Sequence, residues 1–174
     1  MTRVRMLLIP ALMFAPLVAQ EFKGPAAAGR GYAIFHDASK PGSCGNCHLL
    51  GGKGTAAGPD LSRLARLNPR GIKTAIMATR TQYVQAVKTK AGETFPGFEK
   101  SKTDKIVEYF DLSKQPPQLR KFEKAEISGT QDNSSWKHPA EAVGYTAEQL
   151  ADILSYLRFA SYGDTKGVTA EEVE

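Results

Sequence analysis

The clearest hydrophobic pattern lies near the C-terminal end of the chain. Its apolar side chains recur at i, i+3, i+4 and i+7, and they are Leu150, Ile153, Leu154 and Leu157. This spacing places all four on one face of a helix. Thr146 and Gln149 precede them in the order of a capping box, in which each side chain binds the backbone N–H of the other residue. We therefore predict an amphipathic helix that starts after Thr146 and ends near Gly163.

Further helices are expected closer to the N-terminus. Residues 26–35 carry apolar side chains at helical spacing but include two glycines, each of which costs a helix about 1 kcal/mol relative to alanine. Glycine at such a cost indicates that another helix packs closely, and we expect this contact at Gly31. Two short helical stretches are predicted over residues 61–67 and 71–78, separated by Pro69.

The hydrophobic period changes after residue 83. Apolar and polar side chains alternate over residues 106–112, and more weakly over residues 83–89 and 118–127, which is typical of β-strands. Residues 90–93 resemble a hairpin turn. We predict a small antiparallel sheet of three or four strands, over about residues 83–127, inserted into an otherwise helical domain, so the expected fold class is mainly α.

The N-terminal segment is typical of a secretory signal peptide. Arg3 and Arg5 precede an apolar run over residues 6–18, and small residues stand before a plausible cut at Gln20. The run is shorter than the roughly 20 residues that a spanning helix needs. We predict cleavage after residue 19, no transmembrane span in the mature chain, and a periplasmic or otherwise exported protein; an uncleaved N-terminal anchor is the alternative.

The net charge and the length of the chain without its signal peptide limit its possible functions and its number of domains. The chain has 23 Lys and Arg against 18 Asp and Glu, and the loss of Arg3 and Arg5 would lower the net charge from +5 to +3. The basic residues are scattered without interleaved aromatic residues, so we expect no nucleic-acid binding. Residues 20–163 are long enough for one domain, and residues 164–174 are expected to form a flexible acidic tail.

The two cysteines carry the most specific chemistry in the chain. Cys44 and Cys47 are separated by two residues and followed by His48. Two thiols on one helical turn can add to the two vinyl groups of a haem, and the next imidazole then lies under the iron. A zinc site would need further cysteine or histidine pairs, a thioredoxin-like dithiol would need a βαβ pattern, and a disulfide would leave His48 unexplained. We predict one covalently bound haem c.

Several segments resemble class I monohaem c-type cytochromes. They are residues 31–35, Cys44 to His48, residues 58–61 and residues 146–157. The resemblance implies a class I cytochrome c fold in which the first and last helices cross near Gly31. It also implies that the Pro59 carbonyl orients His48 and that Leu61 packs beside the haem. The inserted strand region makes the chain more narrowly similar to cytochrome domains associated with bacterial dehydrogenases.

The second axial ligand departs from that family pattern, which places a methionine in the loop before the last helix. Met77 is the only methionine after the signal peptide, and the expected loop contains none. His138, followed by proline, stands where the methionine would be expected. We predict axial ligation by His48 and His138, with Met77 as the alternative and an open sixth position as a further one. His36 is expected to be exposed.

These features predict an electron carrier and not an enzyme. Its partners would be redox proteins, either a dehydrogenase or another cytochrome. Histidine in place of methionine should lower the reduction potential. The alternative function is a haem-based gas sensor or ligand-binding protein in which the distal histidine is displaced. A peroxidase would need a second haem or a distal acid–base pair, and the sequence suggests neither.

Overall fold

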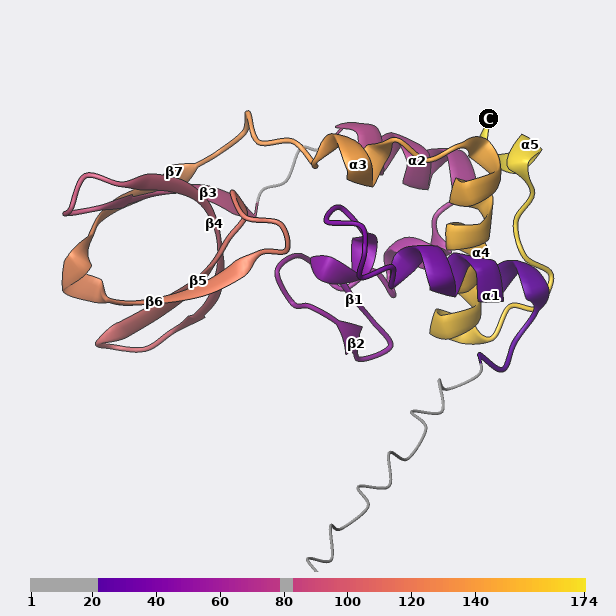
Figure 1. Cartoon of the computed structure of the whole chain (residues 1–174), viewed down its shortest axis with the longest axis horizontal. Coiled ribbons are helices and arrows are strands. Elements are labelled where there is room, and N and C mark those ends of the chain that lie inside the picture. The colour runs from indigo at the N-terminus through magenta and orange to yellow at the C-terminus, as the bar shows by residue number, and fades with distance from the viewer. Residues whose placement is uncertain (1–21, 79–82) are drawn as a thin grey trace, which may run out of the picture.

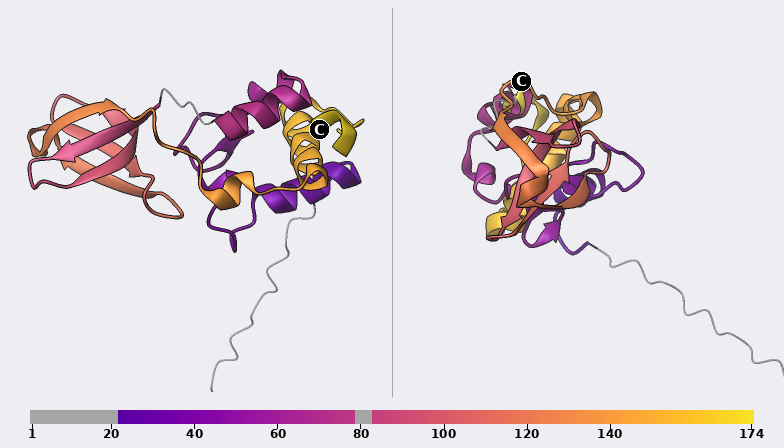
Figure 2. Two further views of the ribbon diagram at one scale, coloured as in Figure 1. Left: turned by 90° about the horizontal axis from the view of Figure 1, so that it is seen from above. Right: turned by 90° about the vertical axis from the view of Figure 1, so that its left-hand side faces the viewer.

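The computed structural model describes residues 22–78 and 83–174, so the predicted signal peptide of residues 1–19 lies outside the described residues. The described chain forms two parts that lie end to end (Figure 1). The helical part contains residues 22–78 and 133–174. The strand insert, residues 84–132, is a curled sheet that projects from one end of the helical part, and the left view in Figure 2 shows the same elongated arrangement.

Two crossing helices form the centre of the helical part. They are α1 (Ala26–Phe35) and α4 (Ala147–Tyr162). A Cβ atom at Gly31 would overlap the carbonyl oxygen of Asp152, so the helices approach as closely as only glycine permits. Phe35 and Leu157 are fully buried beside the crossing. The predicted close contact at Gly31 is therefore confirmed.

Helix α4 begins and ends as its sequence predicts. The Thr146 hydroxyl accepts a hydrogen bond from the Gln149 amide at 3.2 Å, and the Gln149 side chain accepts one from the Thr146 amide at 3.0 Å. Gly163 ends the helix in the left-handed conformation at φ 75°. Capping and the apolar face together make this the most predictable element of the chain.

Shorter elements surround these two helices. Pro69–Ala78 forms α2, and the helix expected over residues 61–67 is reduced to a single 3-10 turn, η2 (Leu64–Arg66). The remaining short elements are η1 (Cys44–Asn46), β1 (Leu49–Leu50), β2 (Lys53–Gly54) and α3 (Ala140–Val143). Within the described ranges, no helix has both the length and the apolar character needed to cross a membrane.

The C-terminal segment is packed, where the sequence led us to expect a flexible tail over residues 164–174. Its short helix α5 (Ala170–Val173) places Val173 in a cluster with Ile72 and Leu154. Val168 joins the same cluster, and its amide donates to the Ser155 hydroxyl at 2.8 Å. Two isolated valines among acidic residues give no periodic signal, which is why this contact was not predicted.

The strand insert is an antiparallel sheet in the order β6-β5-β4-β3-β7. Its strands are β3 (Val84–Thr89), β4 (Thr94–Lys102), β5 (Ile106–Asp111), β6 (Gln118–Glu123) and β7 (Ile127–Asp132). A 3-10 turn, η3 (Lys124–Glu126), precedes the last strand. The first strand, β3, therefore pairs with the last, β7, and this pairing brings together the two ends of the insert. Its own core consists of Val87, Phe95, Val107 and Tyr109.

The expected mainly α, class I cytochrome c fold with a small β insertion is wrong, because the chain has a mixed α and β fold. The sheet has five strands over residues 84–132, where we expected three or four over residues 83–127. The hairpin at residues 90–93 and the strand from residue 106 are confirmed. Strand β4 contains Pro96 and Gly97, and β7 has one apolar residue, Ile127, so neither strand alternates.

Candidate functional site

The segment from Cys44 to His48 folds as one tight turn. The amides of Cys47 and His48 both donate to the Cys44 carbonyl, at 3.1 and 2.9 Å. This turn is η1, and both of its cysteines have free thiols. It therefore presents two thiols and one imidazole within a single turn of chain, as the spacing in the sequence predicts.

The His48 ring is fixed by the loop that follows it. Its Nδ1 lies 2.7 Å from the carbonyl oxygen of Pro59. A carbonyl can only accept, so Nδ1 carries the proton, and in the neutral ring Nε2 has its lone pair free. A Cβ atom at Gly58 would lie only 2.8 Å from Cε1 of His48, so glycine is needed where the loop passes the ring.

The thiols lie in apolar surroundings. Cys44 and Leu61 both pack against the core cluster around Phe35 and Leu157. Burial raises the pKa of the Cys44 thiol to about 11, and burial together with the nearby Cys44 raises that of Cys47 to about 11. Dithiols that exchange disulfides have lowered pKa values, so this pair has the opposite character.

His138 faces His48 across the site. The two ring centres lie 6.2 Å apart and the ring planes are inclined by 42°. Two imidazoles that each place a nitrogen about 2 Å from one metal ion, on opposite sides of it, have ring centres about 6 Å apart. The observed spacing is compatible with one metal ion between the two rings.

Both rings are held in the neutral form that binds metals. Burial lowers the pKa of His48, against smaller raising effects from the Pro59 carbonyl and Asp60. Burial and then the nearby His48 lower the pKa of His138, while the Ile76 carbonyl raises it. The Nδ1 atom of His138 is buried and has no hydrogen-bond partner among residues 22–78 and 83–174.

The two other candidate residues lie elsewhere. Met77 is on α2 with 58% of its surface exposed, so its position does not favour the role of alternative ligand. His36 was expected to be exposed but is half-buried, with Nε2 3.0 Å from the Tyr156 hydroxyl. Burial, followed by the charge of Lys53, lowers its pKa.

Sequence reasoning gave no role to Trp136, which the structure places at the site. Its ring centre lies 5.2 Å from that of His138, and it also packs against the strand insert. It is the only tryptophan in the chain and precedes His138 by two residues, a signal that could have drawn attention to it.

Comparison with known proteins adds no assignment, because no protein-family model matches the chain and no curated protein is significantly similar to it in sequence. In the part of the chain that the structure describes, no three His, Cys, Asp or Glu side chains meet as a site for a bare metal ion. Haem supplies the equatorial ligands of its iron, so two axial residues complete its coordination.

Proposed function

We propose that this chain is an exported, monohaem c-type cytochrome that transfers electrons. Cys44 and Cys47 would hold the haem covalently, and His48 and His138 would ligate its iron. The observation that carries the proposal is the facing pair of imidazoles 6.2 Å apart, directly beside two thiols on one turn.

The donor set fits haem c. Each cysteine Sγ would add across one vinyl group, with a bond to one carbon and the thiol proton on the other, so no oxidant would be consumed. When bound, haem supplies an iron couple that gains and loses one electron. Pro59 fixes the tautomer of His48. Leu61, which packs against the same apolar cluster as Cys44, would help to exclude water from the His48 side of the haem.

Electron transfer is favoured over catalysis because the chain offers an imidazole for each axial position. A substrate would then have no free coordination position. Histidine in place of methionine lowers the reduction potential, which suits exchange with a dehydrogenase or another cytochrome as the redox partner. The thioethers also suit export to the periplasm, where a dissociable cofactor could be lost.

Haem attachment can be tested by mass and by thiol content. The full chain is produced in a bacterial host with working haem-attachment machinery, beside a matched C44A/C47A variant. We expect the parent to gain the mass of one haem and to lose both titratable thiols, and the variant to gain nothing. A parent of unmodified mass with two free thiols contradicts the proposal.

The function as a carrier is tested separately with carbon monoxide. The reduced, haem-loaded chain should resist binding, because His138 occupies the sixth position. Rapid and tight binding would instead identify a gas sensor or ligand-binding protein, in which His138 is displaced.

A further inference from the structure

The loop that carries His138 is tied to the strand insert at its first residue. Asn133 follows β7, and its amide donates to the Val84 carbonyl at the start of β3, at 2.9 Å. The Trp136 amide then donates to the Asn133 carbonyl at 3.2 Å. Two residues later the chain reaches His138, so the insert fixes the point from which this loop starts.

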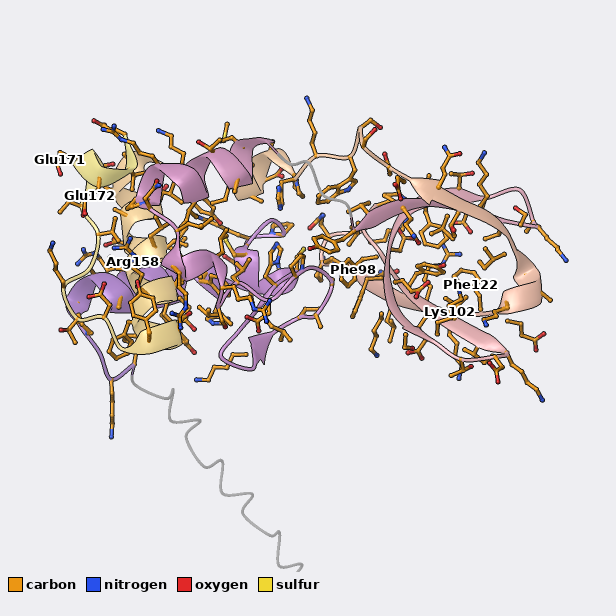
Figure 3. The ribbon with its side chains drawn as sticks, turned by 180° about the vertical axis from the view of Figure 1, so that it is seen from behind. Phe98, Lys102, Phe122, Arg158, Glu171 and Glu172 are labelled. Atoms are coloured by element: carbon orange, nitrogen blue, oxygen red, sulfur yellow. The ribbon has the colours of Figure 1, made fainter. Side chains whose placement is uncertain are left out.

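The loop that carries Pro59 reaches the same surface of the insert. Ala57 is 2% exposed and belongs to one apolar cluster with Val84, Phe110 and Leu112. Phe98 and Trp136 pack against that cluster, and Figure 3 shows Phe98 where the insert faces the helical part. The segments that position both imidazoles thus meet on one end of the insert.

The two imidazoles differ in how they are held. His48 is oriented by a hydrogen bond from Nδ1 to Pro59, 2.7 Å long. The buried Nδ1 of His138 lacks such a partner within the described chain. The ring of Trp136 lies beside the ring of His138, with ring centres 5.2 Å apart and an angle of 60° between the ring planes. The Ile76 carbonyl also acts on the His138 ring, and Trp136 is the contact by which the loop on the side of the insert holds that ring.

We propose that the strand insert is a clamp for the distal ligand and that Trp136 is its positioning residue. This rests on the proposed haem function. The insert anchors Trp136, and Trp136 holds His138 opposite His48, so the insert sets how firmly the sixth coordination position is closed. A change that moves Trp136 away from His138 would then change the distal ligand and leave the thioethers in place.

The test uses the full, haem-loaded chain with Trp136→Ala, Trp136→Phe and a control, Phe122→Ala. Phe122 packs against the insert's own core around Val87 and Phe95, and it lies farther from the helical part than Phe98 does (Figure 3). Its truncation should therefore weaken the insert without removing a contact of Trp136. The readouts are the spin state of the oxidised iron and carbon monoxide affinity of the reduced iron. Trp136→Leu replaces Trp136→Ala if that variant accumulates poorly.

We expect Trp136→Ala to keep its covalent haem, to gain a high-spin component, and to bind carbon monoxide about tenfold more tightly, because more molecules have an open position. Trp136→Phe should restore most of the parent behaviour. The Phe122→Ala variant should melt at a lower temperature with unchanged spectra.

Two results overturn the clamp while the haem proposal stands. One is a Trp136→Ala variant whose spectrum and carbon monoxide affinity equal those of the parent. The other is a Phe122→Ala variant with equally altered spectra, since general loosening would then explain both. If the unmutated chain binds no haem, the proposed function itself is wrong, and this outcome differs from both results above because no haem spectrum is then seen.

Discussion

The loops on either side of the candidate iron position are built in different ways. The proximal side, from Cys44 to Pro59, lies within 16 residues, and its key contact joins His48 to a carbonyl 11 residues away. The distal side places His138 after the whole strand insert, beside a ring that packs on that insert. Proximal chemistry is therefore encoded locally, whereas the distal geometry depends on tertiary packing.

The largest effect is expected on the proximal side. His48→Ala removes the proposed ligand that adjoins Cys44 and Cys47, so we expect loss of the low-spin spectrum and a large drop in the yield of haem-loaded chain. Absorption per mole of purified chain measures this. Met77→Leu is the control and should match the parent. An unaltered spectrum in His48→Ala would show that the proximal assignment is wrong.

The next effect is on the distal side. His138→Met replaces imidazole by a thioether ligand, which raises the reduction potential while the haem stays attached. Redox titration against the parent measures the change, and His138→Ala separately reports on an open position. If both variants keep the potential and spectrum of the parent, His138 does not bind the iron.

On the proximal side, Cys44 and Leu61 pack against the core cluster beside the crossing of α1 and α4, and a stability measurement can probe that crossing. Gly31→Ala forces a methyl group against the Asp152 carbonyl and should lower the free energy of unfolding by about 1–3 kcal/mol. Gly129→Ala is the matched control, because its Cβ would meet no described atom within 4 Å. Equal denaturation midpoints for the two variants would contradict the close crossing.

The smallest effect is the dependence of stability on pH. His36, His48 and His138 all have a lowered pKa because of burial. In the haem-free C44A/C47A chain, the unfolded state therefore takes up protons that the folded state does not. Stability should be constant above the unfolded pKa of 6.5 and should fall as the pH drops below it.

Melting temperatures of that chain at pH 8 and pH 5.5 measure this change. His36→Gln should reduce the slope, because it removes one of the three groups. A melting temperature that rises on acidification would contradict the buried, neutral state of these rings.

Local signals made the proximal side and α4 predictable from the sequence. The spacing of Cys44, Cys47 and His48 and the capping box at Thr146 each involve residues within one or two turns of chain. The fold class was mispredicted because β4 and β7 have no alternation, and because the pairing of β7 with β3 joins residues far apart in sequence.

The role of Trp136 depends on the same long-range packing. A lone tryptophan in a polar loop gives no periodic signal, and the apolar cluster of Val84, Phe110 and Leu112 against which it packs exists only after the sheet has formed. The docking of Val173 on α4 escaped prediction for the same reason. Contacts of this kind cannot be inferred from hydrophobic spacing along the chain.

The pairing of His48 with His138 is tested most directly by the visible and near-infrared spectrum of the oxidised, haem-loaded protein. We predict a low-spin spectrum typical of two imidazole ligands, without a charge-transfer band from methionine sulfur. A sulfur charge-transfer band, or a purely high-spin spectrum, would contradict the pair.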